Sequence, residues 1–285
     1  MEKMNTYLLN KIFTVPYIDK MIDENSVPDS FLKCIQRYVK SENVTYGKAI
    51  SEIYHYMDSE YRNEYFYKNT ILNKLLIEKH DIYNTAALTE LPIGESKADF
   101  IMINGRGVVY EIKTDLDNLT RLENQIRDYY KVFSYVYVVV GKKQLQKVKD
   151  CLKNQKVGIY ELTEGKRLIQ RRKAYCNRED LSHESMFQLL RKHEFESIIL
   201  KHYGKLPKVN NFQYYRECLK WLQKINVVSL QKDVMNCLKT RTLLKIENGF
   251  DEKVPYELKF YAYFSKKYRL NYSELDSFLC KEVEE

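Results

Sequence analysis

The chain has 285 residues, of which 44% are hydrophobic and 30% charged, and its formal net charge is +8. This is the composition of a globular protein, and it excludes a disordered or collagen-like chain. The most apolar run, from Tyr135 to Val140, is too short to span a bilayer, so we expect no membrane segment. Six cysteines without any C-x-x-C pair argue against a zinc ribbon or a disulfide framework and favour the cytoplasm.

The N-terminal part of the chain is expected to be a helical extension. Asp29 and Ser30 are predicted to cap an early helix, and Thr45 is predicted to cap a second one over 46–57. A longer helix is predicted over 62–79, because apolar residues recur there at near-helical spacing. The extension itself covers residues 1–60.

A change to β-prone sequence follows this helix. Four short runs bounded by Pro, Gly and Asn are typical of strands, at 85–91, 98–103, 108–114 and 135–140. The apolar stripe over 119–133 predicts a crossover helix packed on a sheet. The predicted order is therefore helix, three strands, helix, strand, and the fold class is α/β with a mixed sheet.

The remaining chain is predicted to be a strand pair followed by helices. A further strand or hairpin is expected within 157–169, and helices are expected over 186–203, 211–224, 230–238 and 256–268, with Ser273 capping a last turn. A helix-turn-helix across 214–244 is an alternative interpretation. We thus expect an N-terminal extension (1–60), a core with a basic segment (61–173) and a helical C-terminal region (174–285).

The positive charge is concentrated in one segment. Residues 141–173 contain eleven Lys and Arg against three Asp and Glu, so this segment accounts for the whole net charge of +8. Such a block can neutralise phosphates and bind nucleic acid without reading its sequence. A solvated helix face that keeps the protein soluble is an equally good explanation of the charge alone.

The segment that carries chemistry is the predicted hairpin from Lys97 to Lys113. Alternation places Glu111 and Lys113 on the same face of their strand, within otherwise apolar sequence. If the hairpin loop has three residues, Asn104 to Arg106, Asp99 lies directly opposite Glu111, and a longer loop displaces the pairing by about one position. Two carboxylates and an ammonium group would then converge.

Two opposed carboxylates on an apolar sheet need a positive charge that compensates their negative charges. They repel each other, and burying their charge costs several kcal/mol unless it is neutralised. A divalent cation resolves the conflict, and hard oxygen ligands suit Mg²⁺ or Mn²⁺. The absence of a local His or Cys cluster argues against Zn²⁺.

The motif Asp99, then Glu111-Ile112-Lys113 after a short hairpin, resembles the core of the PD-(D/E)XK nuclease superfamily. The order of predicted elements agrees with a restriction-endonuclease-like core. Gln125 and Tyr129 on the crossover helix are similar to the Q-x-x-x-Y motif of the RecB-like branch. The literal Pro-Asp pair is absent, since Ala98 precedes the aspartate, and the resemblance covers about eighty residues.

The resemblance implies roles for individual residues. Asp99 and Glu111 would bind the metal, Lys113 would assist catalysis, and Gln125 with Tyr129 would position the substrate strand or the metal site. The third acid is left open between Glu64 and Glu90, each of which is also explained as an ordinary surface charge. Further candidates for contacts with nucleic acid are Lys68, Arg121, Lys142 and Lys143, although Lys68 is equally explained as a surface lysine.

The resemblance implies a Mg²⁺- or Mn²⁺-dependent nuclease, with DNA favoured over RNA as substrate. Restriction, phage defence, repair and mobile elements are its expected settings. The alternative is a catalytically silent nucleic-acid-binding or assembly module that keeps the fold. The sequence leaves open a homodimer or a partner protein.

Overall fold

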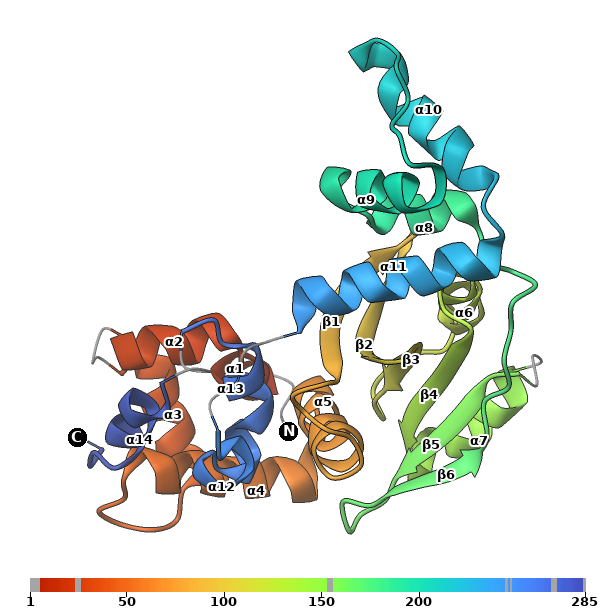
Figure 1. The fold of residues 1–285 in the computed structure, drawn as a ribbon. Coiled ribbons are helices and arrows are strands. Elements are labelled where there is room, and N and C mark those ends of the chain that lie inside the picture. The colour runs from red at the N-terminus through yellow and green to blue at the C-terminus, as the bar shows by residue number, and fades with distance from the viewer. Residues whose placement is uncertain are drawn as a thin grey trace. The chain divides into compact units, whose positions relative to one another are not determined.

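The computed structural model describes residues 6–23, 27–152, 156–243, 246, 248–267 and 271–283. The protein is an α/β protein with a six-stranded mixed sheet flanked by helices (Figure 1). The chain forms two compact units, of which the first contains residues 1–83, 162–168 and 244–285 and the second contains 84–161 and 169–243. The three segments expected from the sequence, with boundaries at residues 60 and 173, stay a prediction.

The first unit is built from helices near both ends of the chain. The N-terminal set is α1 (Thr6–Ile12), α2 (Val15–Asp23), α3 (Asp29–Tyr38), α4 (Tyr46–Glu60), α5 (Glu64–Ile71) and the π-helix η1 (Leu72–Ile77). The C-terminal set is α12 (Phe250–Lys253), the 3-10 helix η2 (Tyr256–Leu258), α13 (Lys259–Phe264) and α14 (Tyr272–Leu279). The long helix predicted over 62–79 is therefore an α-helix that continues as a π-helical segment.

The predicted helix caps have mixed outcomes. The Thr45 hydroxyl accepts a hydrogen bond from Lys48 N at 3.3 Å, which confirms it as the cap of α4. The prediction for Asp29 and Ser30 is wrong, because α3 already begins at Asp29. Ser273 likewise lies inside α14 rather than at its cap. Residue 268, in the helix predicted over 256–268, lies outside the described residues.

One buried amide joins the two helical sets of the first unit. Asn69 Nδ2 on α5 donates hydrogen bonds to Tyr54 Oη and to the carbonyl of Tyr256, both at 2.9 Å. Its Oδ1 accepts from the backbone N–H of Phe260 at 2.9 Å. A buried amide is stable only when its polar atoms are paired. The C-terminal segment is therefore required to complete the hydrogen bonds of the Asn69 side chain.

The second unit contains the sheet, whose strand order is β1-β2-β3-β4-β5-β6. The strands are β1 (Ala86–Ile93), β2 (Ser96–Asn104), β3 (Arg106–Lys113), β4 (Tyr135–Gly141), β5 (Gly158–Leu162) and β6 (Leu168–Arg172). β1, β2 and β3 pair antiparallel, and β4 pairs parallel with β3. The four predicted strands and the additional strand pair are confirmed.

Helices α6 to α11 complete the second unit. They are α6 (Leu122–Tyr130), α7 (Lys142–Cys151), α8 (His183–Leu189), α9 (Lys192–Tyr203), α10 (Asn211–Gln223) and α11 (Val227–Thr242). The single helix predicted over 186–203 is two helices, because Leu190 is extended and α9 starts anew where the Glu194 carboxylate accepts a hydrogen bond from the backbone N–H of Arg191 at 2.7 Å. No helix in the described part of the chain is long and apolar enough to cross a membrane.

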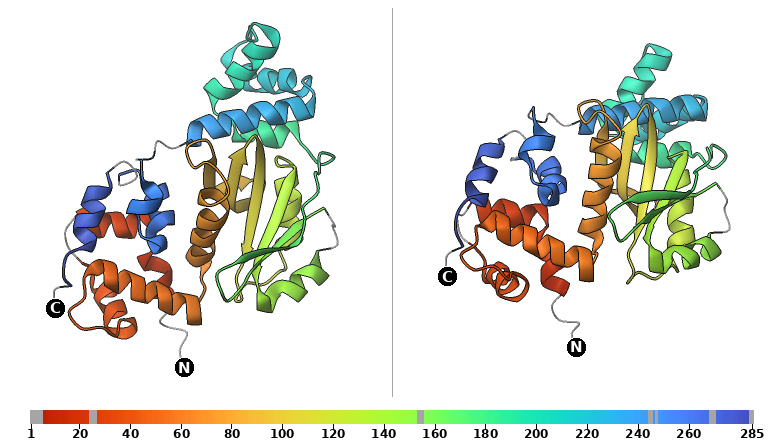
Figure 2. Two further views of the ribbon diagram at one scale, coloured as in Figure 1. Left: turned by 60° about the horizontal axis from the view of Figure 1, so that its bottom comes forward. Right: turned by 90° about the horizontal axis from the view of Figure 1, so that it is seen from below.

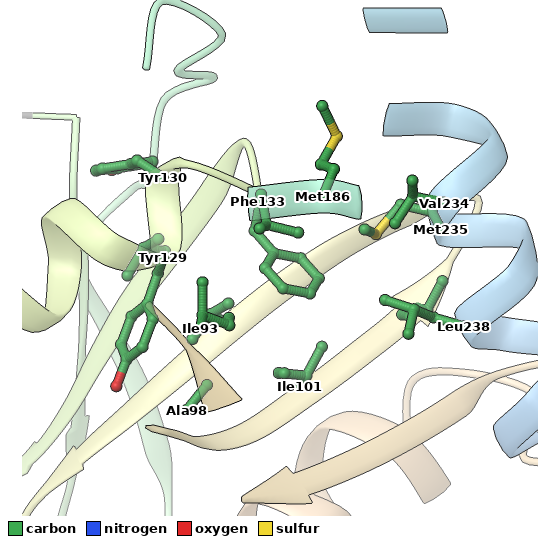
Figure 3. Packing of buried hydrophobic residues seen from close by; sticks show 14 of the residues in the cluster. Ile93, Ala98, Ile101, Tyr129, Tyr130, Phe133, Met186, Val234, Met235 and Leu238 are labelled. Carbon is green, nitrogen blue, oxygen red and sulfur yellow. The ribbon is translucent and has the colours of Figure 1, made fainter. Parts of the chain in front are cut away.

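The apolar face of α11 packs on the sheet. This helix contacts β1, β2 and β3, and its residues Leu230, Val234 and Leu238 are fully buried. Figure 3 shows Val234, Met235 and Leu238 facing Phe133 and Ile101 in this core. One face of α11 is therefore part of the core, and the helix-turn-helix alternative across 214–244 stays a prediction.

The turn between β1 and β2 packs against the Asp128 side chain of α6. Ile93 pairs with Ser96 across a two-residue turn, and Gly94 adopts a positive φ of 60°. A Cβ atom at Gly94 would lie 2.9 Å from the carboxylate oxygen Oδ1 of Asp128. Glycine is thus required here by both backbone conformation and space.

We expect Gly94→Ala to lower the free energy of unfolding by about 2 kcal/mol, from the left-handed backbone and the contact with Asp128. Gly105→Ala is the matched control, because Gly105 has a φ of 68° with no atom near its missing Cβ. It should cost about 1 kcal/mol. Urea unfolding of both variants measures the difference, and equal losses would contradict the role given to Asp128.

Candidate active site

The register of β2 and β3 brings the predicted acids opposite each other. The ladder runs from Asn104↔Arg106 to Phe100↔Tyr110, so its continuation by one residue places Asp99 opposite Glu111. This is the register predicted for the shorter hairpin loop. At this point Asp99 Oδ2 accepts a hydrogen bond from the backbone N–H of Ile112 at 2.7 Å.

Glu111 is the most deeply buried acid of the site, with 1% of its surface exposed. Its Oε1 lies 2.8 Å from Lys113 Nζ and accepts a hydrogen bond from Gln125 Nε2 at 2.5 Å. Its Oε2 accepts from the Tyr129 hydroxyl at 2.6 Å. Because a buried carboxylate is stable only when compensated, these three partners make the position of Glu111 tenable.

The partners of Glu111 also hold one another. Lys113 Nζ donates to Gln125 Oε1 at 2.9 Å, and Gln125 and Tyr129 lie one turn apart on α6. Burial, reinforced by the neighbouring Glu111 carboxylate, raises the pKa of the Tyr129 hydroxyl far above its ordinary value, so Tyr129 remains a hydrogen-bond donor. The structure thus brings Glu111, Lys113, Gln125 and Tyr129 into one hydrogen-bonded group beside Asp99.

Asp128, the neighbour of Tyr129 on α6, was not predicted from the sequence. It accepts a hydrogen bond from Ser96 Oγ at 2.7 Å and pairs with Lys131 at 2.6 Å. Burial opposes its ionisation, yet the bonds from Lys131 and Ser96 hold its pKa below the ordinary value. An acid on the buried side of an amphipathic helix is the signal that could have identified it.

Glu90 lies on β1 in a strained conformation. The pairs Thr89↔Phe100 and Leu91↔Ala98 flank it, which places Glu90 opposite Asp99. Its φ is 57°, a region that non-glycine residues in strands avoid. One of its carboxylate oxygens lies within 4.8 Å of one of Asp99, and Lys97 Nζ is 2.5 Å from its Oε2. Strain of this kind is typical of functional sites.

Glu64 and Lys68 belong to the first unit, whereas the other candidate residues belong to the second. Glu64 is the first residue of α5, and its Oε1 lies 2.5 Å from the Nζ of the buried Lys68. Asn63 caps this helix by accepting a hydrogen bond from Phe66 N. The roles of Glu64 in metal binding and of Lys68 in phosphate contact stay predictions.

The loop between β3 and α6 is fixed by Gln144, which the sequence did not single out. The buried side chain of Gln144 on α7 donates its best hydrogen bond to the carbonyl of Asp117 at 2.8 Å. Neither Asp117 nor Asn118 caps α6, because Asp117 closes the turn after β3 by accepting from Thr114 N at 2.7 Å. Arg121 occupies the N-cap position of α6 and is exposed.

The basic segment is partly neutralised within the protein. Ion pairs within the described part of the segment join Lys143 with Asp115, Lys156 with Glu179, Lys166 with Asp58 and Arg171 with Glu161. The lysines of α7 remain exposed to solvent, including Lys142 and Lys143 in its first turn. Arg167 and Lys173 outside α7 are exposed as well, so the charge available to a partner is smaller than the segment's net charge but is not confined to α7.

The fold and site define an α/β protein with a buried Glu-Lys-Gln-Tyr group beside an aspartate. A family model described as Bacteriophage P4 protein cII matches residues 57–247, about two thirds of the chain. The chain therefore belongs to the bacteriophage P4 protein cII family. Comparison with curated proteins and with solved structures gives no significant match.

Adjacent tyrosines on α6 provide a test of the buried network. Tyr129→Phe removes the donor to Glu111 and should lower the free energy of unfolding by about 1–3 kcal/mol. Tyr130→Phe is the control, since the buried Tyr130 hydroxyl has no hydrogen-bond partner among the described residues, and it should cost close to nothing. Chemical denaturation compares the two, and similar losses would show that the Tyr129 bond contributes little.

Two substitutions at Glu90 isolate its backbone strain. Glu90→Gly and Glu90→Ala remove the same carboxylate, but only glycine adopts a positive φ without steric cost. We expect the glycine variant to be more stable than the alanine variant by about 1 kcal/mol. Thermal unfolding measures the difference, and an alanine variant of equal or higher stability would show that the conformation stores no strain.

Proposed function

We propose that the chain is a Mg²⁺- or Mn²⁺-dependent nuclease with a PD-(D/E)XK, restriction-endonuclease-like core, which hydrolyses phosphodiester bonds of nucleic acid, DNA rather than RNA. The observation that carries the proposal is the buried Glu111–Lys113 ion pair opposite Asp99. Replacing such a pair with apolar residues of similar volume is often neutral or stabilising, so packing alone does not explain it. A chemical role explains why charge is kept inside the sheet.

The donor set suits a hard divalent cation. A carboxylate has about four lone-pair positions, and Lys113, Gln125 and Tyr129 together supply three donors to Glu111. Glu111 therefore keeps capacity for a ligand, and Asp99 and Glu90 add two further carboxylates. These three residues would hold the metal, with Glu64 as the alternative third acid. The metal would supply an activated water and stabilise charge on the phosphate.

Hydrogen bonds within the protein fix the side chains that would take part in the reaction. The Lys113 ammonium is fixed by Glu111 and Gln125, and it would hold the attacking water or offset negative charge that develops on the phosphate. Gln125 and Tyr129 hold Glu111 in one orientation, so no rearrangement is needed during the reaction. Asp99 is held in the same way by the backbone N–H of Ile112.

The proposed path of the nucleic acid backbone lies at the C-terminal ends of strands β3 and β4. β3 and β4 are parallel, and Lys113 at the end of β3 pairs with Val140 near the end of β4. α7 begins at Lys142, directly after β4, so its first turn lies at the same end of these two strands as Lys113. The exposed Lys142 and Lys143 and the helix N-terminus there favour a phosphate group. Arg121 and Lys68 are further proposed contacts.

The three protein donors that already bind Glu111 also support a second candidate. In a catalytically silent module, the same network would stabilise the fold while the basic α7 still bound nucleic acid. Membership of a phage protein family supports a setting in a phage or mobile element for either candidate. Restriction, phage defence and repair are further proposed settings.

Cleavage assays test the nuclease. Wild type should cut supercoiled, linear duplex or single-stranded DNA with Mg²⁺ or Mn²⁺ and not in EDTA, and RNA should be the poorer substrate. Asp99→Asn keeps an acceptor for Ile112 N but loses the charge, and it should reduce the cleavage rate by at least about a hundredfold. Lys113→Ala should have an effect of similar size.

Glu123→Gln on the exposed side of α6 is the control and should cut like wild type. Thermal unfolding of each variant separates loss of chemistry from loss of fold. Binding of Mn²⁺, followed by electron paramagnetic resonance, should weaken in Asp99→Asn. A wild type that binds nucleic acid but cuts none of the substrates with either metal would favour the silent module.

A further inference from the structure

The exposed apolar side chains of the protein gather in one short stretch of the second unit. Ten large hydrophobic side chains are exposed among the described residues, and five of them lie between residues 200 and 215. These five are Leu200, Tyr203, Val209, Phe212 and Tyr215. Single exposed apolar residues are ordinary, but a concentration of this kind marks a contact surface.

The same stretch is positively charged throughout. Residues 200–216 contain three lysines and an arginine and no Asp or Glu. Lys201 pairs with Asp233 of α11, whereas the side chains of Lys205, Lys208 and Arg216 are exposed. Glu217 follows Arg216 directly, but its carboxylate is paired with Lys220 at 3.0 Å and accepts a hydrogen bond from Trp221 Nε1. The stretch therefore keeps a net positive charge, which attracts a polyanion and makes a purely apolar partner less suitable.

Among the exposed aromatic rings of this stretch, that of Phe212 is fully exposed to solvent. α9 and α10 pack against each other, and the connection between them begins at Gly204, whose φ is 68°. Figure 1 shows α10 extending away from the strands, and Figure 2 shows the same arrangement from two further directions. Phe212 in the first turn of α10 is 100% exposed, and Arg216 lies one turn later on the same helical face. The opposite face carries the buried Cys218 and Leu222.

We propose that Lys205, Lys208, Phe212 and Arg216 form a binding surface for single-stranded nucleic acid. An unpaired base would stack on the Phe212 ring, while the three cations would contact the phosphates on either side. The faces of bases in a duplex are covered by their neighbours, so a projecting ring favours unpaired strands. The inference rests on the proposed function, because it gives the nuclease a preference for substrates with a single-stranded part.

Binding is measured in EDTA, so that cleavage does not enter the result. The full chain is titrated into a fluorescein-labelled dT20 strand and followed by anisotropy, with a 20-base-pair duplex as comparison. Phe212→Ala should weaken binding to dT20 about tenfold. Phe212→Leu should lose as much, because leucine is apolar but has no ring to stack on. Binding to the duplex should change less than twofold.

The salt dependence separates the two kinds of contact. Lys205→Ala/Lys208→Ala should reduce the slope of log K against log salt by about 1.4, since each phosphate contact to a single strand contributes about 0.7. Phe212→Ala should leave this slope unchanged. Leu116→Ala removes another exposed apolar side chain, and Lys33→Ala/Lys232→Ala removes two other exposed lysines. The first control should bind dT20 like wild type, and the second should leave the slope at its wild-type value.

The proposal is overturned if Phe212→Ala and Phe212→Leu bind dT20 like wild type. It is also overturned if Phe212→Leu restores wild-type binding, or if sedimentation shows that Phe212→Ala abolishes a dimer while binding is unchanged. In that last case the surface joins two copies of the chain. A protein that cuts no substrate but loses dT20 binding in both Phe212 variants would refute the nuclease and retain this surface.

Discussion

The buried carboxylate of Glu111 sets the arrangement of the second unit. A charge in that position is stable only if Lys113, Gln125 and Tyr129 reach it at the same time. Two of these partners come from α6, so the rotation of α6 about its axis is determined by hydrogen bonds to the strand as well as by apolar packing. The crossover helix is therefore locked against β3 by polar contacts inside an otherwise apolar layer.

Helix α6 also contacts the neighbouring strand β2. Tyr129 Oη lies 2.9 Å from the carbonyl of Lys97, and Asp128 binds Ser96, so α6 holds the first residues of β2. Asp99 follows directly along that strand. Its position opposite Glu111 thus depends on Tyr129, which also positions Glu111, and on Asp128, which has no part in the proposed chemistry. A site assembled in this way is rigid because each of its polar groups is held by another.

Local sequence patterns predicted much of the second unit. Alternation and turn residues located the four strands. The spacing of the hairpin left two registers open for Asp99 and Glu111, and the structure has the one predicted for the three-residue loop. The grouping of Lys113, Gln125 and Tyr129 agrees with the roles implied by the resemblance. The left-handed conformation of Glu90 leaves no trace in the pattern, because it depends on how β1 meets β2. The ion pairs that neutralise part of the basic segment are also long-range contacts, and sequence spacing does not reveal them.

The path of the chain through its two units has a consequence for how the protein folds during synthesis. Residues 84–161 and 169–243 contain the sheet and its helices, except for Leu162 at the end of β5 and Leu168 at the start of β6. The second unit therefore has all of its own chain once residue 243 has left the ribosome. The first unit does not, because Asn69 finds two of its three partners at Tyr256 and Phe260. The N-terminal helices are synthesised first, but their core is complete only after the last part of the chain has been synthesised.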